Sequence, residues 1–375
     1  MTRDSKPLYL GTMSGTSMDG LDLVAIDFSH NKPVLQHHGH TPYPDELRKN
    51  LQHAALNEST TISAACNLDT QLGQFYAQEI NLFLDKNSIQ RDEIAAIGSH
   101  GQTIRHSPQG GFPYTLQIGD PNIIAARTGL NVVADFRRRD LALGGQGAPL
   151  TPAFHHEVFL TELNNRAIIN IGGIANITLL AADSSIPVTG FDTGPGNTLM
   201  DHLSALHLGQ NFDRNGNFAR SGKVHSAILQ NMLTESFFHL KAPKSTGTDH
   251  FSPAWLEKHD LNSLSPADAM CTTLELTAAS ISQSIKMQDT IPDECFVCGG
   301  GAHNGFLLER LQHHLRSVKV DTTEKLGISP DWVEATAFAW LARQTMLFLP
   351  GNLPSVTNAK YSTILGGVYF SHGQY

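Results

Sequence analysis

Long apolar runs are missing from this 375-residue chain. None approaches the roughly 20 consecutive apolar residues that a membrane-spanning helix needs. The opening stretch, MTRDSKPLYLG, also lacks the apolar core of a secretion signal. We therefore expect no membrane partner and place the protein in the cytoplasm. Cysteine is scarce as well, with four in the chain, which fits a reducing compartment.

Metal-binding and redox motifs are nearly absent. Cys295 and Cys298 form one CxxC, which can be a redox pair or half of a zinc site. No second CxxC accompanies it, and the segment has the pattern of a buried strand that runs into glycines, so we favour a packing role. None of the 19 histidines belongs to an H-E-x-x-H motif.

Positive charge is in deficit. The chain has 26 basic and 35 acidic side chains, for a formal net charge of −9. This balance argues against nucleic acid as a partner and against binding to an anionic membrane. It does not exclude a small anion, because backbone dipoles and a few cations can bind one locally.

What the sequence has is a pattern that occurs twice. An apolar strand, a glycine-rich loop and a second strand open the chain, and RAIINIGGIANITLLAA repeats that order at residues 166–182. Strands alternate with helical patterns after each hairpin, which predicts two α/β domains of related topology facing a cleft. We place these domains at residues 1–135 and 136–375, with the C-terminal tail able to return to the first. Ser-Pro pairs predict helix starts at Ser265 and Ser329.

The opening loop, GTMSGTSMDGLD, has the chemistry of a phosphate-binding loop. Glycines let backbone N–H groups face a ligand, and Ser and Thr hydroxyls add donors. No Gly-Lys-Ser/Thr follows, so it is not a Walker A loop. Asp19 replaces the last glycine of G-x-S-x-G, so it is not a nucleophile elbow. The alternative is an ordinary hairpin, for which Asp-Gly is a common turn signal.

Two further glycine turns follow. The Gly172-Gly173 hairpin would be a second phosphate clamp, although each hairpin could also be a plain tight turn. The triple glycine at residues 299–301 lacks the spaced GxGxxG of a dinucleotide site, but could bring backbone against a purine.

Asp192, in GFDTGPGN, is the best acid–base candidate. It ends an apolar strand, where an α/β domain usually binds its ligand. The alternative is that it caps the turn before the next helix. His100, Gln102 and Arg105 lie at another strand end and are candidates for the substrate. Arg137 begins a run of three arginines that could meet an anion, although such a run is more often a solvated edge.

The chain resembles the bacterial 1,6-anhydro-N-acetylmuramic acid kinases over essentially its whole length. The motifs that carry the resemblance are, in order, MSGTSMDGLD, SHGQTIRH, ADFRRRDLALGGQGAPL, NIGGIANIT, GFDTGPGN and CGGGAHNG. It implies two duplicated actin-like (ribonuclease H-like) α/β domains flanking an ATP cleft. It also implies a reaction in which water opens the internal anhydro bond and O6 takes the γ-phosphoryl group of ATP. The product would be N-acetylmuramate 6-phosphate, an intermediate of peptidoglycan recycling.

The resemblance also implies roles for residues, with ATP and Mg²⁺ as cofactors and a homodimer as the assembly. Asp192 matches the catalytic base. Asp19 and Asp22 would hold the metal through water. The substrate candidates become His100, Gln102, Arg105, Arg137 and Glu334. Residues that would bind ATP are Gly15, Thr16, Ser17, Met18, Asp19, Gly20, Leu21 and Asp22 in the first loop, Gly172, Gly173 and Asn176 in the second, and Gly299, Gly300, Gly301 and Asn304 on the adenosine side.

Two other functions stay open at this point. The first is a simpler sugar kinase of the same fold, in which Asp192 would deprotonate a free hydroxyl. The second is a nucleotide-switched binding protein of the heat-shock type. That protein would need a further peptide-binding domain, for which 375 residues leave little room.

Overall fold

The computed structural model describes residues 7–30, 32–56 and 59–371. Its internal contacts divide the chain into two compact units. The first unit comprises the described residues up to Phe154 together with those from Trp332 onward, and the second is His155–Asp331. The first unit thus extends past the predicted boundary at residue 135 and also includes the C-terminal segment, because helix α13 (Val333–Met346) packs on the first sheet.

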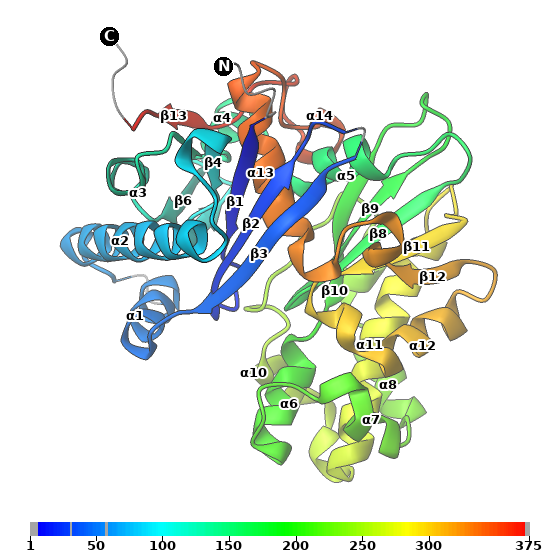
Figure 1. Ribbon diagram of the computed structural model, residues 1–375. Coiled ribbons are helices and arrows are strands. Elements are labelled where there is room, and N and C mark those ends of the chain that lie inside the picture. Colours follow the sequence, from blue (N-terminus) through cyan, green and yellow to red (C-terminus); the bar gives the residue numbers. More distant parts are fainter. Residues whose placement is uncertain (1–6, 31, 57–58, 372–375) are drawn as a thin grey trace. The chain divides into compact units, whose positions relative to one another are not determined.

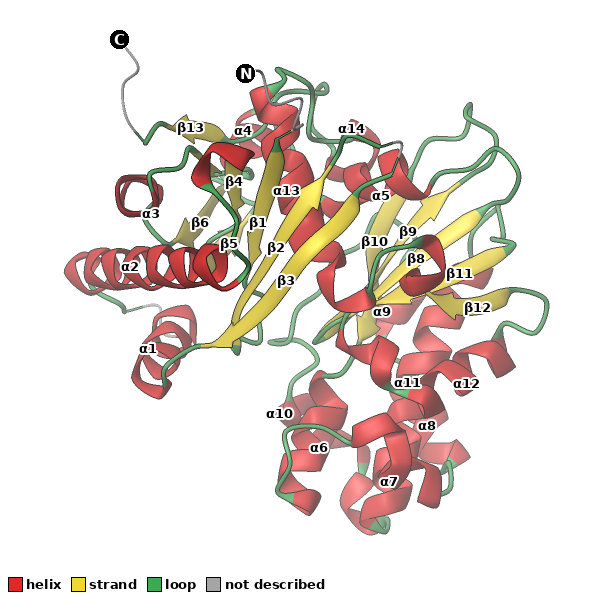
Figure 2. Ribbon diagram, viewed as in Figure 1, coloured by secondary structure: helices red, strands yellow, loops and turns green. Residues whose placement is uncertain are grey.

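The first unit is built on a mixed sheet (Figures 1 and 2). Its strand order is β13-β7-β4-β1-β2-β3. Strand β1 pairs antiparallel with β2, which pairs antiparallel with β3, whereas β1, β4 and β7 run parallel. The strands are β1 (Leu8–Met13), β2 (Gly20–Asp27), β3 (Val34–Pro42), β4 (Ile94–Ser99), β7 (Val132–Ala134) and β13 (Gly367–Tyr369).

Helices cover both faces of this sheet. On one face α13 lies so close that a Cβ on Gly11 would overlap the carbonyl oxygen of Ala335, and one on Gly98 would overlap that of Phe338. On the other face α2 (Ile62–Lys86) and α3 (Pro121–Thr128) close the core. The remaining elements are α1 (Asp45–Leu56), a hairpin of β5 (Gln102–Ser107) and β6 (Tyr114–Ile118), α4 (Arg138–Ala142), α5 (Thr151–Phe159) and α14 (Pro354–Thr357).

The second unit repeats the sheet of the first. Its order is β10-β9-β8-β11-β12, with β8 antiparallel to β9, β9 antiparallel to β10, and β8, β11 and β12 parallel. This matches β3-β2-β1-β4-β7 strand for strand, which confirms the predicted duplication. The strands are β8 (Arg166–Ile171), β9 (Ile174–Leu180), β10 (Thr189–Pro195), β11 (Glu294–Cys298) and β12 (Lys319–Thr322).

Long helix α11 (Pro266–Lys286) is nearly all buried and packs on β10 and α12 (Gly305–His314). Ser265 caps it as predicted, since its side chain accepts a hydrogen bond from the N–H of Asp268. The other Ser-Pro prediction is wrong by a turn: Pro330 opens a short 3₁₀ turn and α13 begins at Val333. The shorter helices are α6 (Thr198–Leu208), α7 (Asn217–Ser221), α8 (Ser226–Met232), α9 (Ser236–His239) and α10 (Pro253–Leu256).

The predicted packing role of the CxxC agrees with the structure. Cys295 and Cys298 are both buried on β11, and neither forms a disulfide. Burial raises the pKa of the Cys295 thiol to about 12, so it stays protonated and unreactive near neutral pH. Among the described residues, no helix is both long and apolar enough to cross a membrane.

Candidate functional site

The loop between β1 and β2 is held from behind by one buried side chain. Gln102, which has no exposed surface, accepts a hydrogen bond from Ser14 Oγ at 2.7 Å and donates one to the carbonyl of Gly15 at 3.1 Å. Within the loop, the N–H of Met18 bonds to the same Gly15 carbonyl. Gln102 was predicted to meet the substrate, but its amide is occupied in fixing the shape of the loop.

Two tyrosines also support the loop, and no motif in the sequence pointed to them. The N–H of Tyr43 donates to the carbonyl of Asp19, and the hydroxyl groups of Tyr43 and Tyr76 lie 2.9 Å apart in the core. Burial raises the pKa of Tyr43 to about 12, so this pair stays neutral. The loop therefore stands on a rigid base, while Thr16, Ser17 and Asp19 at its tip are exposed.

Asp19 and Asp22 supply the carboxylates of this loop. Asp19 Oδ1 accepts a hydrogen bond from Ser17 Oγ at 2.9 Å, and Asp22 Oδ1 lies 2.8 Å from Nδ1 of His40. That hydrogen bond is the main reason that the pKa of His40 is raised. The described residues contain no cluster of three or more His, Cys, Asp or Glu side chains suited to a metal. Two carboxylates do suit Mg²⁺, which takes most of its other ligands from water and phosphate.

The first unit also brings together three of the predicted substrate residues. Arg137 donates from Nη2 to Nε2 of His100 at 2.9 Å and from Nη1 to the carbonyl of Gly147 at 2.8 Å. Burial, followed by the charge of Arg137, holds the pKa of His100 well below its usual value, so His100 is a neutral acceptor. Its ring also packs 4.6 Å from that of Phe338 on α13.

Glu334, at the start of α13, completes this cluster. Burial and the charge of Asp22 raise its pKa, while Arg137 acts in the opposite direction. Arg137 in turn has its pKa lowered to about 10 by burial, against the charges of Glu334 and Asp140. The guanidinium of Arg137 and the carboxyl group of Glu334 thus interact close to Asp22 at the β1–β2 loop.

Arg105 is placed differently from the other candidates. Its Nη1 donates to the carbonyl groups of Ala54 and Ala55 at the C-terminal end of α1, at 2.6 and 2.9 Å, and to that of Ile104 at 2.8 Å. A cation at the C-terminus of a helix stabilises the helix dipole. The structure therefore gives Arg105 a role in holding α1 to β5.

In the second unit Asp192 lies on β10 and is held by a segment that the sequence analysis missed. Asp192 Oδ2 accepts hydrogen bonds from the N–H of Thr246 at 2.9 Å and from Ser245 Oγ at 3.0 Å. Burial raises the pKa of Asp192, although these two bonds and the charge of Lys244 act in the opposite direction. No described residue donates a hydrogen bond to Oδ1, so this oxygen is available to accept a proton.

The signal for this segment was its sequence, KSTGTD at residues 244–249, which has the hydroxyl and glycine content of a ligand loop. Lys244 Nζ is buried and donates to the carbonyl of Phe237 at 3.1 Å. This anchor fixes the start of the segment, and the two residues that follow it reach Asp192. The alternative, in which Asp192 caps the turn before the next helix, does not describe these contacts, which Asp192 makes with a loop distant in the sequence.

The Gly172-Gly173 hairpin is held by backbone groups. The N–H groups of Gly196 and Asn197 donate to the carbonyls of Gly173 and Gly172, at 2.9 and 2.7 Å. The side chain of Asn197 donates to the carbonyl of Ile171 at 3.1 Å. The carbonyls of the turn are therefore occupied by the segment that leads into α6.

Asn176 and Asp201 lie close to the same segment in the second unit. Asn176 on β9 pairs in register with Asp192 on β10 and with Asn170 on β8. Asp201 in the first turn of α6 was not predicted, yet burial raises its pKa to about 7.

The third glycine turn follows β11. Gly299 has φ of +75°, which favours glycine, and a Cβ there would overlap Asn170 Oδ1. The turn continues as a 3₁₀ segment, Gly300–His303. Asn304 then caps α12, because its Oδ1 accepts a hydrogen bond from the N–H of Leu307 at 3.0 Å. The backbone of the turn is thus free of side chains, as a flat ligand requires, whereas the side chain of Asn304 is used by the helix.

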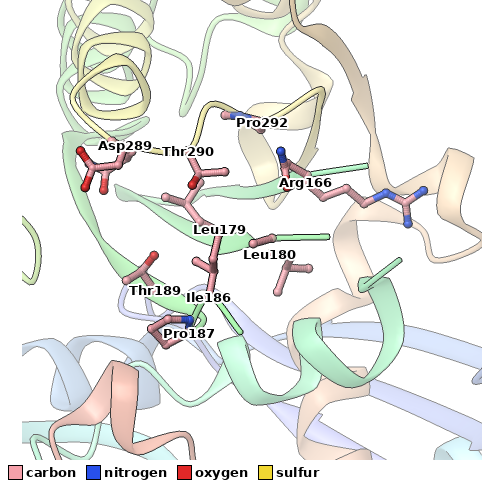
Figure 3. Close-up of a pocket in the computed structure, with 12 residues that line it drawn as sticks. Arg166, Leu179, Leu180, Ile186, Pro187, Thr189, Asp289, Thr290 and Pro292 are labelled. Carbon is pink, nitrogen blue, oxygen red and sulfur yellow. The ribbon is translucent and has the colours of Figure 1, made fainter. Parts of the chain in front are cut away.

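A cavity of about 180 Å³ lies at the other end of the second sheet, where β8 begins and β9 ends (Figure 3). Leu179, Leu180 and Ile186 line it. Figure 3 shows the guanidinium of Arg166 directed away from these side chains. That group is bound to Glu294 at 3.0 Å and to the carbonyl of Phe159 at 2.8 Å. None of the residues predicted for the functional site lines this cavity.

The duplicated strand order, with a glycine hairpin at the same place in each sheet, defines a two-domain actin-like, ribonuclease H-like α/β protein. The model of the family described as anhydro-N-acetylmuramic acid kinase matches residues 7–371. The chain belongs to this family.

The similarity to individual members of the family extends over nearly the full length of both chains. The chain is 47% identical to an anhydro-N-acetylmuramic acid kinase of Coxiella burnetii over 367 residues, covering 97% of this chain and 98% of the relative. It is 49% identical to that of Shewanella loihica, covering 97% and 99%. A ROK family glucokinase from Streptomyces griseus, solved with glucose and AMPPNP, aligns over 90% and 99% of the two chains. The sequence identity between the two chains is 12%, and the TM-score of their superposition is 0.42.

Proposed function

We propose that this protein is an ATP-dependent kinase of 1,6-anhydro-N-acetylmuramic acid. It hydrolyses the bond between the anomeric carbon and O6 and transfers the γ-phosphoryl group to O6, giving N-acetylmuramate 6-phosphate and ADP for peptidoglycan recycling. The observation that carries this proposal is the identity of 47–49% with proteins of that name across 97% of the chain.

Asp192 is the proposed general base. Its Oδ1 takes a proton from water, the water oxygen bonds to the anomeric carbon, and the bond from that carbon to O6 breaks. The hydrogen bonds from Thr246 and Ser245 to Oδ2 support this role, because they fix the carboxylate without occupying Oδ1. Burial also raises the basicity of the group. No protein acid is required at O6, since the phosphoryl group captures its charge.

The glycine turns are proposed to bind ATP through their backbone. The exposed tip of the β1–β2 loop and the Gly172-Gly173 hairpin would contact the phosphates, and the turn at Gly299 the adenosine. Phosphoryl transfer depends mainly on such positioning and on charge stabilisation. Asp19 and Asp22 would hold Mg²⁺ through water, and the ion would neutralise charge on the phosphates.

For the sugar we propose the cluster of His100, Arg137 and Glu334. Arg137 can pair with the carboxylate of the lactyl group, and Glu334 can accept hydrogen bonds from hydroxyl or amide groups. Gln102 acts at one remove, by fixing the loop through Ser14 and Gly15. For Arg105 we propose a structural role, in which its guanidinium holds the end of α1.

The test uses the purified protein with ATP, Mg²⁺ and anhydro-muramic acid in ¹⁸O-labelled water. We expect one ¹⁸O atom at the anomeric position of the phosphorylated product, seen by mass spectrometry and by the isotope shift in ¹³C NMR. A phosphorylated sugar with its anhydro ring intact would instead favour the simpler sugar kinase. Slow ATP hydrolysis that is independent of sugar would favour a nucleotide switch.

We also propose that the protein acts in the cytoplasm, where ATP is available, and as a homodimer. The resemblance to the family supports both. Sedimentation equilibrium of the full chain tests the assembly, and a mass of one 40.8 kDa chain at micromolar concentration would contradict it.

A further inference from the structure

The first unit contains a cavity of about 460 Å³ to which the proposed kinase function assigns no ligand. It lies between the first turns of α2, strand β6, and the ends of β4 and β7. Its volume is in the range of pockets that hold small organic molecules. Of the residues proposed for ATP, metal and sugar, His100 alone lines it. The cavity is therefore a separate feature of the first unit.

Ser99 provides evidence that this cavity is built for a ligand. Its side chain is 1% exposed, and its Oγ has no hydrogen-bond partner among the described residues. Leaving a buried hydroxyl unpaired costs stability. Strand alternation fixes where it points: Gly98 faces Phe338 of α13, so Ser99 faces the opposite side, which α2 and α3 cover and where the cavity lies. A ligand in the cavity can complete this missing bond.

The charges around the cavity favour a cation. Asp69 and Asp135 line it with carboxylates, and Arg138 is the cation among its lining residues. Arg138 is already bound to Asp135 at 2.7 Å. Asp69 uses Oδ1 to accept the N–H of Gly119 at 2.6 Å. Burial raises the pKa of Asp69, as does the nearby charge of Asp120. The charges of Asp69 and Asp120 thus repel each other, and a cation bound at Asp69 would relieve this repulsion.

The remaining lining groups are suited to the uncharged part of such a ligand. Thr115 and Gln117 on β6 offer a hydroxyl and an amide, and Tyr369 on β13 offers a phenol beside the carboxylates. Burial and then the charge of Asp135 raise the pKa of Tyr369, so it remains a neutral donor. Leu116 and Ile118 add apolar surface.

We propose that this cavity binds a small organic ammonium ion that also carries hydroxyl or amide groups, with the ammonium at Asp69 and a polar group on Ser99. The site is adjacent in sequence to residues of the sugar cluster. Ser99 precedes His100 on the end of β4, and Arg138 follows Arg137. An occupant would therefore contact both segments that position the His100–Arg137 pair, which makes the site a candidate for regulation.

Cys66 allows the proposal to be tested without any assay of kinase activity. It lines the cavity and is exposed, whereas the other three cysteines are buried. Alkylation of Cys66 by iodoacetamide, followed by peptide mass spectrometry, thus reports occupancy. The probes are D-glucamine and D-glucitol, which differ in carrying an ammonium or a hydroxyl group at one carbon. We expect millimolar D-glucamine to slow alkylation several-fold at pH 7, and D-glucitol to have little effect.

Variants assign the effect to the cavity. Asp69→Asn keeps the acceptor for Gly119 but removes the charge, and should weaken protection by D-glucamine about tenfold. Ser99→Ala should weaken it about threefold. Asp85→Asn, an exposed position on the same helix, is the matched control and should leave protection unchanged. Should Asp69→Asn fail to fold, Asp135→Asn tests the contribution of the other lining carboxylate, which follows the end of β7.

Two results would overturn the proposal. One is equal protection by D-glucamine and D-glucitol, or none by either. The other is protection that persists in full in both Asp69→Asn and Asp135→Asn. Neither result bears on the kinase proposal, which the isotope experiment tests separately.

Discussion

The β1–β2 hairpin and the β8–β9 hairpin stand at the same place in two sheets of the same strand order, but different groups hold them. In the first unit the support comes from side chains: Ser14, Gln102 and the Tyr43–Tyr76 pair. In the second unit it comes mostly from the backbone, where N–H groups of residues 196–198 donate to the carbonyls of Gly172 and Gly173.

The two hairpins therefore present different chemical groups, although they occupy the same place in the duplicated fold. The first loop is longer and exposes hydroxyl and carboxylate groups at its tip, so it can meet phosphate and a metal ion. The second hairpin presents almost bare backbone, and its unit keeps a buried carboxylate, Asp192, on the neighbouring edge strand β10.

Replacing Asp192 by Asn is the change with the largest expected effect. The amide keeps the shape of the side chain but cannot accept the proton, so kcat should fall by about 10²–10⁴-fold. Binding of ATP, followed by calorimetry, should be retained. Asp289→Asn, at an exposed position of the same unit, is the control. Turnover within threefold of the parent in Asp192→Asn would remove this residue as the base.

Glycine substitutions test whether the second hairpin depends on its backbone contacts. A Cβ at Gly196 would overlap the carbonyl of Gly172, so Gly196→Ala should lower the free energy of unfolding by about 1–3 kcal/mol. At Gly172 the nearest atom to a Cβ is Ile174 O at 3.7 Å, and at Gly15 it is Ser17 Oγ at 3.8 Å. Gly172→Ala and Gly15→Ala should therefore keep their stability and raise the KM for ATP. Urea unfolding separates the two outcomes, and equal stability losses at Gly196 and Gly172 would contradict the assignment.

Gln102→Leu tests the side-chain support of the first loop. It leaves Ser14 Oγ in the core without its acceptor, so the free energy of unfolding should fall by about 1–3 kcal/mol. The KM for ATP should rise as the loop loosens. Asn197→Leu is the counterpart in the second unit, where backbone bonds remain, and its effect should be smaller. A larger effect at Asn197 than at Gln102 would reverse the comparison.

The smallest effect concerns the buried histidine of the second unit. Burial lowers the pKa of His155 to about 3, so as pH falls below 6.5 the unfolded chain takes up a proton that the folded state refuses. Stability is thus complete above pH 6.5 and declines as pH falls toward 3. His155→Gln should reduce the slope of unfolding free energy against pH by up to about 1.4 kcal/mol per pH unit between pH 6 and 4. The exposed His207→Gln should leave the slope unchanged.

Much of the fold followed from local pattern. Apolar strands flanking glycine loops predicted both hairpins, and Pro121 and Gly129 mark the two ends of α3. The start of α13 was misplaced, because Ser329-Pro330 has the form of a cap but opens a 3₁₀ turn. The return of α13 to the first sheet depends on glycines at 11 and 98, far away in the sequence, which no local pattern connects to it.

The candidate site divides in the same way. Residues whose chemistry is local, such as the loop glycines and Asp192 on a strand, could be proposed as candidates from the sequence. Roles that depend on partners were not. Gln102 supports a loop formed some 88 positions earlier in the chain, and Ser245 and Thr246 reach Asp192 across 53 and 54 positions. Arg105 was predicted to meet the substrate because it lies near a strand end beside His100, but its guanidinium binds the end of α1.

The sequence alone determined the family, the duplication and the positions of the glycine turns, and it named Asp192 as the candidate base, because each of these depends on residue types at short spacing. Only the tertiary structure showed which side chains hold the loops and that Glu334 belongs to the first unit. It also showed the cavity lined by Ser99 and Asp69. These features arise where segments distant in the chain are packed together, since burial and hydrogen bonding set the charge and direction of each group. The order of residues does not directly show which distant segments lie in contact, so these features could not be predicted from it.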